Sequence, residues 1–203
     1  MNTLCWNCRG MGQPRTVRSL AELVRSNKPQ VVGLIETKLE GERIIAIRRK
    51  LGFEHGLEVD CRGRSGGLAI WWKDDIHLTV RSYSIFHIDC EIEMEEKSRL
   101  TLFYGNPITN RRIETWDLLR RLGHQNSLPW LVLGDFNEVL FGWETEGKRI
   151  RGEWQMRRFR ETMVDCGLYD LGYNGLPFTF SNRRAGSLEM KARLDRAFGN
   201  MEW

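Results

Sequence analysis

One stretch decides how the chain folds: Trp130-Leu131-Val132-Leu133-Gly134-Asp135-Phe136-Asn137. Its short apolar run is typical of a buried strand, which we predict over Pro129–Gly134. Asp135 follows the run directly, and a carboxylate at the end of an apolar strand suits a hard cation such as Mg²⁺. Asn137 adds an amide that both donates and accepts hydrogen bonds, so the pair could aim a water molecule at phosphorus.

Polar side chains follow other predicted strands in the same way. Asn7 follows the first strand, Glu36 follows the second, Tyr104 ends a middle strand, and Asp195 lies in a late one. Functional side chains are often presented by loops at strand ends. A tyrosine hydroxyl can also donate to a developing phosphorane or to a leaving oxygen.

Each of these residues also has a structural explanation when it is taken singly. Glu36 suits the N-terminus of a helix, Asp135 suits a turn, Asn7 can cap a turn, and Tyr104 can be a core aromatic. The ordered set of residues is harder to explain in this way, and it therefore predicts a site.

The apolar periodicity predicts strands and helices along the whole chain. Strands are predicted over Thr3–Cys8, Gln30–Ile35, Gly67–Trp72, Ile76–Arg81, Ile85–Glu93, Arg99–Tyr104, Pro129–Gly134, Leu168–Leu171, Phe178–Phe180 and Lys191–Phe198. Helices are predicted over Pro14–Asn27, Leu39–Leu51, Ile113–Leu122 and Trp154–Val164. We expect the four middle strands to be consecutive and antiparallel. The pattern predicts an α+β fold, an α/β sandwich of two packed mixed β-sheets flanked by helices.

Length and composition exclude several classes of protein. With 203 residues, 41% of them apolar, the chain has enough material for a sizeable core, and we expect a single domain over residues 1–203. Disordered, collagen-like and low-complexity chains are excluded. The apolar runs are too short to span a bilayer, and the first residues lack the pattern of a secretory signal.

The charge distribution permits a polyanionic partner. The formal net charge is +4, from 31 Lys and Arg against 27 Asp and Glu. Cations concentrate in and around the last long helix, and this stretch is either a solvated face or a phosphate-contacting surface. The candidate nucleic-acid contacts are Lys148, Arg149, Arg151 and Arg157.

Five cysteines are scattered along the chain, and we expect reduced thiols because no secretory signal supports disulfides. Cys5 and Cys8 form a C-x-x-C pair, which raises the hypothesis of a zinc or redox site. No second Cys/His pair lies at ligand spacing, so the pair is interpreted as two small apolar residues.

Five motifs stand in order along nearly the whole chain. They are Trp-Asn-x-Arg-Gly at 6–10, Ile-Glu-Thr-Lys at 35–38, Tyr-Gly-Asn-Pro at 104–107, Gly-Asp-Phe-Asn at 134–137 and Arg-Leu-Asp-Arg at 193–196. The set resembles the endonuclease/exonuclease/phosphatase superfamily, which has the deoxyribonuclease I-like fold. It is most similar to the endonuclease domain of plant LINE-type non-LTR retrotransposons, through residues 6–17 and the stretch from Cys166 to Gly172 that runs into Phe178-Thr179-Phe180-Ser181-Asn182.

The resemblance implies a role for each motif residue. Glu36 would bind the catalytic metal, Mg²⁺ or alternatively Mn²⁺, with Asn7 in the same site. Asp135 would orient or deprotonate the attacking water, Asn137 would fix the phosphate, and Tyr104 would lie against it. Asp195 would hold a catalytic histidine. The implied reaction is nicking of double-stranded DNA that leaves a 3′-hydroxyl and a 5′-phosphate.

The sequence departs from the family pattern at two places. Arg9 stands where the family often has an aspartate, although plant retroelement relatives commonly share this change. The family also ends on a strand carrying Ser-Asp-His, and no such strand follows Asp195, so we expect a C-terminally truncated domain. We nominate no catalytic base among the four histidines, which are His55, His77, His87 and His124.

Two alternatives to an active endonuclease therefore stay open. The chain could be a catalytically inactive relative that binds nucleic acid or another partner, or a phosphatase acting on a small or lipid phosphate. For the enzyme we expect DNA as partner, a monomer without a stable protein partner, no membrane association, and a nuclear or cytoplasmic location.

Overall fold

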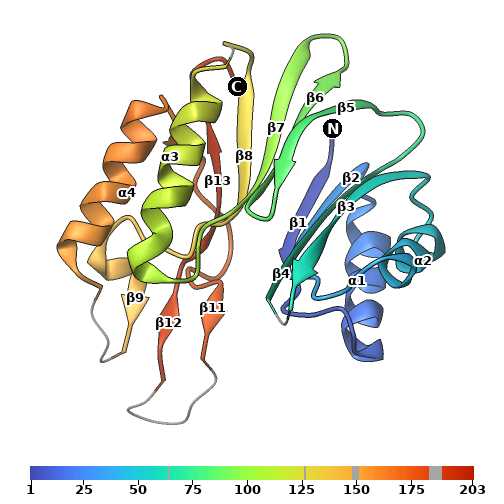
Figure 1. Cartoon of the computed structure of the whole chain (residues 1–203), viewed down its shortest axis with the longest axis horizontal. Coiled ribbons are helices and arrows are strands. Elements are labelled where there is room, and N and C mark those ends of the chain that lie inside the picture. The colour runs from blue at the N-terminus through green and yellow to red at the C-terminus, as the bar shows by residue number, and fades with distance from the viewer. Residues whose placement is uncertain (64, 126, 148–150, 183–188) are drawn as a thin grey trace. The chain divides into compact units, whose positions relative to one another are not determined.

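The computed structural model describes all residues except 64, 126, 148–150 and 183–188 (Figure 1). The chain divides into two units, Met1–Phe103 and Tyr104–Trp203, and each is described by itself. The expectation of a single domain stays a prediction. Among the described residues, no helix is both long and apolar enough to span a membrane.

The first unit opens with a strand, a helix and a second strand that lies parallel to the first. These elements are β1 (Thr3–Asn7), α1 (Pro14–Asn27) and β2 (Val31–Ile35). Pro14 lies in the first turn of α1, where its fixed φ suits the helix and its missing N–H costs nothing. Lys28 ends the helix in the left-handed conformation, and its N–H donates to Val24 O at 2.8 Å. Both boundaries confirm the sequence prediction.

The remaining strands of this sheet come from later in the chain. They are β3 (His55–Arg62) and β4 (Ser65–Trp72), with α2 (Glu42–Lys50) before them, and the strand order is β1-β2-β4-β3. The sequence prediction missed β3. Among the described residues this strand pairs only with β4, at the edge of the sheet, so its sequence needs no continuous apolar run.

An antiparallel meander follows in the same unit, formed by β5 (His77–Ser84), β6 (His87–Glu93) and β7 (Lys97–Tyr104). The expectation that Gly67–Trp72 starts this run is wrong, because β4 pairs with β2 and β3 instead. The two layers approach closely within the unit, since a Cβ on Gly33 would lie 2.8 Å from Leu102 Cδ1. Gly33 therefore allows β2 and β7 to pack.

Among its described residues, the second unit contains two α-helices and two small groups of strands. The helices are α3 (Arg112–Gly123), preceded by η1 (Thr109–Arg111), and α4 (Glu153–Asp165), and they lie side by side (Figure 1). One group comprises β8 (Trp130–Asp135), β13 (Asp195–Gly199) and β10 (Tyr169–Asp170). The other comprises β9 (Thr145–Glu146), which follows η2 (Gly142–Glu144), β12 (Lys191–Ala192) and β11 (Phe180–Ser181).

Aromatic side chains form the core of the second unit. Trp116 of α3 stacks on Phe159 of α4 at 4.8 Å between ring centroids, and Phe136 meets Phe198 edge-on at 4.9 Å. The helices are thereby fixed against the segment that leaves β8.

The prediction of one strand over Lys191–Phe198 is wrong in one respect, because the stretch forms two strands, β12 and β13. Between them, Leu194 donates its N–H to Thr179 Oγ1 at 3.1 Å, and Arg193 donates its N–H to Glu144 O at 3.1 Å. These bonds end the pairing of β12, and the chain then joins β8.

Candidate active site

The first unit brings Asn7 and Glu36 together. In the parallel register of β1 and β2, Asn7 lies opposite Ile35, so the next residue, Glu36, lies beside it. Asn7 Nδ2 donates to Glu36 Oε1 at 3.4 Å, and Lys38 Nζ lies 3.1 Å from Glu36 Oε2. The backbone N–H of Arg9 donates to Asn7 Oδ1 at 3.1 Å. The structure thus brings these two residues together, and their role in binding a metal stays a prediction.

The backbone around this group is strained. Arg9, Glu36 and Lys38 have φ values of 50°, 55° and 52°, which side chains other than glycine rarely adopt. The conformation is held by Thr37, whose N–H donates to Gly67 O at 3.1 Å. Gly67 makes room for it, because a Cβ there would lie 2.3 Å from Thr37 Oγ1. Strain of this kind concentrates at functional sites.

The second unit brings Tyr104, Asp135 and Asn137 together around Gly105. Asn137 also has a positive φ, of 54°. Its N–H donates to Asp135 Oδ1 and its Nδ2 donates to Gly105 O, both at 2.8 Å. The N–H of Gly105 donates to Asp135 O, also at 2.8 Å, which fixes the end of the segment that carries buried Tyr104.

Gly105 is required for this arrangement. A Cβ at this position would lie 2.1 Å from Phe136 O, a distance that no side chain can occupy. The absence of a side chain therefore lets Tyr104 and the Asp135–Asn137 turn approach each other.

Asp195 lies directly opposite Asp135 in the antiparallel pairing of β8 and β13. Side chains opposite each other on neighbouring strands lie on the same face, with Cβ atoms about 5 Å apart. Asp135 is buried, with 5% of its surface exposed, while Asp195 is half-buried. Two carboxylates thus share one face at the strand ends.

The donor atoms near Glu36 fit a divalent cation. Glu36 offers a carboxylate and Asn7 an amide oxygen, and Mg²⁺ in proteins binds one or two carboxylates while it keeps several waters. Within the described ranges, no group of three or more His, Cys, Asp or Glu side chains could hold a metal ion, so a cation here would depend on Glu36, the Asn7 amide and water. In the structure, Lys38 supplies the positive charge beside Glu36.

The C-x-x-C pair lies close to this group. Cys5 is in β1, and Cys8 is buried immediately after it. Burial, with a smaller contribution from the negative charge of Glu36, raises the pKa of Cys8 to about 12. A thiol of this kind is a poor metal ligand or nucleophile.

The candidate nucleic-acid contacts have different surroundings. Lys148 and Arg149 lie outside the described residues. Arg151 is largely buried, and its Nη1 lies 3.7 Å from Glu138 Oε1. Arg157 is exposed and pairs with Glu161 on the same helix at 3.6 Å. Of the two described cations, Arg157 is therefore the one whose charge faces solvent.

Two of the histidines have polar partners of their own. His55 Nε2 lies 3.0 Å from Asp74 Oδ1, and the His55 ring stacks on Trp72. His87 is buried between the hydroxyls of Ser82 and Ser84, at 3.0 and 2.8 Å. Both arrangements explain these residues through local packing, and neither histidine is needed as a catalytic base.

Sequence reasoning gave no role to Trp154 on α4, and it included Arg158 only in the cationic stretch around this helix, without naming it as a contact. Their side chains lie together on one helix face, with the Arg158 guanidinium 5.4 Å from the centre of the Trp154 ring. Spacing of four residues between an exposed tryptophan and a cation is the signal that could have identified them.

Comparison with solved structures identifies the fold that carries the candidate site residues. The endonuclease domain of TRAS1, a telomere-specific non-LTR retrotransposon, has a TM-score of 0.71 and 15% identity, covering 99% of this chain and 85% of its own. An AP endonuclease from Leishmania major has a TM-score of 0.75 and 17% identity, covering 99% and 79%. A 3′ phosphatase, NExo, from Neisseria, bound to a product DNA hairpin, has a TM-score of 0.74 and 16% identity, covering 99% and 87%. The expected deoxyribonuclease I-like fold is confirmed.

The sequence itself gives a second line of comparison. A search of curated proteins finds no match. The model of the Endonuclease/Exonuclease/phosphatase family, however, matches residues 4–200, which span both groups of candidate site residues. The chain therefore belongs to the endonuclease/exonuclease/phosphatase family.

Proposed function

We propose that the chain is a metal-dependent phosphodiesterase that nicks double-stranded DNA and that it derives from a retrotransposon. The observation that carries this proposal is the turn after β8, where two hydrogen bonds hold buried Asp135 and Asn137 against Gly105 and a third joins Asn137 N–H to Asp135 Oδ1. Membership of the family supports the class of reaction. A monomer acting on DNA in the nucleus or the cytoplasm is the simplest form of the proposal.

The first-unit residues would hold the metal. Glu36 and the amide oxygen of Asn7 would bind Mg²⁺ or Mn²⁺, and the bound cation would supply positive charge that polarises the phosphate. Lys38 would neutralise Glu36 until the cation enters, because its ammonium lies 3.1 Å from Glu36 Oε2.

The second-unit residues would act on the water and the phosphate. Asp135 accepts a proton from the water while the water oxygen bonds to phosphorus. The bond from phosphorus to the 3′ oxygen breaks, and that oxygen takes up a proton from solvent. Asn137 orients the phosphate, and Tyr104 donates a hydrogen bond to it. In the family pattern Asp195 would position a catalytic histidine, and none of the four histidines of this sequence is nominated for that role.

One observation favours a second candidate, a catalytically inactive nucleic-acid-binding module. A cation already stands at the proposed metal site, because Lys38 Nζ lies 3.1 Å from Glu36 Oε2. Its positive charge opposes the binding of a metal ion there. The remaining alternative is a phosphatase acting on a small phosphate. It differs from the proposed endonuclease only in its substrate, so a substrate assay distinguishes the two.

The test is nicking of supercoiled plasmid by the purified chain in Mg²⁺. We expect nicking to be weak, because no histidine of the sequence is nominated as the catalytic base. A polymerase should extend the 3′ ends of these nicks directly, and EDTA should abolish the nicking. Glu36→Gln should lower the rate by on the order of 10²-fold or more. The matched control is Glu42→Gln, which makes the same change at an exposed residue of α2 and should keep the wild-type rate.

Each other outcome has a defined meaning. Nicking that survives both EDTA and Glu36→Gln contradicts the proposal. A folded chain that binds plasmid but never nicks it supports the inactive module. Release of phosphate from a monoester without any nicking supports the phosphatase.

A further inference from the structure

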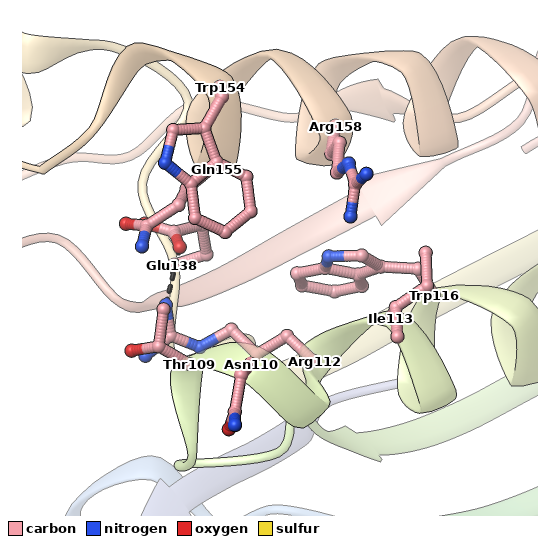
Figure 2. A pocket seen from close by; sticks show the side chains of 9 residues that line it. All are labelled: Thr109, Asn110, Arg112, Ile113, Trp116, Glu138, Trp154, Gln155 and Arg158. Carbon is pink, nitrogen blue, oxygen red and sulfur yellow. Dashed lines mark hydrogen bonds and ion pairs between the residues drawn. The ribbon is translucent and has the colours of Figure 1, made fainter.

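A pocket lies in the second unit beside the turn that carries Asp135 and Asn137, since Glu138, the next residue, lines it. Its volume is about 360 Å³, at the small end of the range for ligand sites. It is bounded by the start of α3 on one side and the first turns of α4 on the other (Figure 2). The lining residues are Thr109, Asn110, Arg112, Ile113, Trp116, Glu138, Trp154, Gln155 and Arg158.

Two indoles give the pocket aromatic surface. Trp154 projects from α4 toward α3, and half of its surface is exposed. Trp116 faces it from α3 and is held in place by its stack on Phe159. An exposed tryptophan beside a fixed one provides a surface on which a flat ring can stack.

The polar side chains around these indoles are available to a ligand. Within the described part of the chain, the side chains of Thr109, Asn110 and Gln155 make no hydrogen bond. Together they offer both donors and acceptors at the rim. A ring with a polar edge would therefore find partners here, whereas an aliphatic ligand would leave these groups without partners.

The charges around the pocket favour an anion. Glu138 is buried and contacts two arginines, Arg112 with Nη1 2.5 Å from Oε2 and Arg151 with Nη1 3.7 Å from Oε1. Arg158 is exposed, contacts the Trp154 ring, and has no ion pair among the described residues. Positive charge therefore exceeds negative charge beside the aromatic surface.

We propose that this pocket binds one unpaired base of a nucleic-acid strand, with the adjoining phosphodiester against Arg158. The inference rests on the proposed function, because it takes the substrate to be nucleic acid. It adds a base-binding site to the proposed reaction. The base stacks on Trp154, its polar edge meets Asn110 or Gln155, and its phosphate lies against the exposed Arg158 guanidinium.

The test compares two labelled octanucleotides by fluorescence anisotropy in EDTA, where no hydrolysis takes place. One carries abasic sugars at all eight positions, and the other carries a single central adenine. We expect adenine to tighten binding to the wild-type chain by about 5- to 100-fold, the range for base–aromatic stacking. Trp154→Ala should abolish this gain, and Trp154→Phe should keep most of it.

Neighbouring residues provide matched controls. Arg158→Ala should reduce the gain, while Arg157→Ala removes the same charge one residue away and should weaken both oligonucleotides equally. Trp143→Ala removes another exposed indole of the same unit, outside the pocket, and should leave the gain intact. Circular dichroism of each variant confirms that it is folded.

Equal binding of the two octanucleotides by the wild-type chain overturns the proposal, as does a gain that survives Trp154→Ala. An acidic-peptide site is one cause of equal binding, because such a site recognises charge without a base. Since binding is measured without metal, its failure is separate from that of the plasmid assay. If Glu36→Gln abolishes nicking while adenine adds nothing, the enzyme assignment stands and the base site does not.

Discussion

At the scale of single residues, Glu36 already pairs with Lys38 at the position where the proposed metal ion would bind. Its carboxylate accepts from Asn7 on one oxygen and pairs with Lys38 on the other, 3.1 Å away. The Lys38 side chain is about one-third exposed (36%), so water screens the pair and its net strength is modest. A divalent cation that enters this site must displace or outcompete the lysine.

Removing that lysine charge is therefore expected to tighten metal binding. Lys38→Gln should lower the Mn²⁺ dissociation constant, measured by calorimetry, by about two- to fivefold, the equivalent of a partly exposed ion pair. Lys28→Gln is the matched control, since Lys28 also has a positive φ but caps α1 at an exposed position. Unchanged or weaker Mn²⁺ binding in Lys38→Gln would exclude Glu36 as the metal ligand.

The thiol of Cys8 gives a second test at this scale. Burial raises its pKa to about 12, and a raised thiol pKa disfavours the thiolate at every pH below it. At pH 8 only about one molecule in 10⁴ carries the reactive thiolate, and that fraction rises as pH rises toward the pKa. We expect Cys8 to resist iodoacetamide in the native chain at pH 8 and to react after unfolding in urea, as measured by mass spectrometry. Rapid native labelling, or a Cys5–Cys8 disulfide, would restore the redox hypothesis.

At the scale of elements, the site depends on how closely the segment after β7 approaches the turn after β8. Gly105 allows this approach, because its N–H and C=O bond to Asp135 and Asn137 at 2.8 Å while a Cβ would lie 2.1 Å from Phe136 O. The contact is backbone against backbone, so no side-chain rotation can relieve the overlap.

Gly105→Ala should therefore damage the site as well as stability. We expect unfolding to become easier by about 1–3 kcal/mol, the usual result of overpacking, and nicking to fall by more than tenfold. Gly142→Ala is the control, since nothing lies within 4 Å of a Cβ there. Urea unfolding and the plasmid assay measure the two effects. A Gly105→Ala variant with wild-type nicking would mean that Tyr104 and Asn137 do not act together.

The elements also show why sequence reasoning succeeds in some places and fails in others. β2 was predictable because all five of its residues are buried, which forces a continuous apolar run. β3 was not, because an edge strand exposed on one side needs no such run. Strand-end residues such as Glu36 could be named from the motif order. The partner of Arg151, Glu138, could not, because a contact across 13 positions has no local signature.

At the scale of the whole molecule, a net charge of +4 does not by itself indicate where an anionic strand would bind. Many of the cations are already paired, as Arg112 and Arg151 are with Glu138 and Arg196 is with Glu144 and Asp170. The exposed face of α4 differs, since Arg158 has no ion pair among the described residues and Arg157 has only a long contact to Glu161. Binding to DNA should therefore depend on a few cations of this helix.

The salt dependence of DNA binding measures how many cations take part. For duplex DNA the slope of log K against log salt is about −0.9 for each phosphate neutralised, so contacts from Arg157 and Arg158 predict a slope of about −2 or steeper. Arg157→Ala and Arg158→Ala should each make the slope shallower by about one, measured by anisotropy in EDTA. Arg151→Ala should change it less, because Glu138 already offsets that charge. If neither exposed arginine alters the slope, α4 does not contact the DNA backbone, and the phosphate-binding surface must lie on other residues.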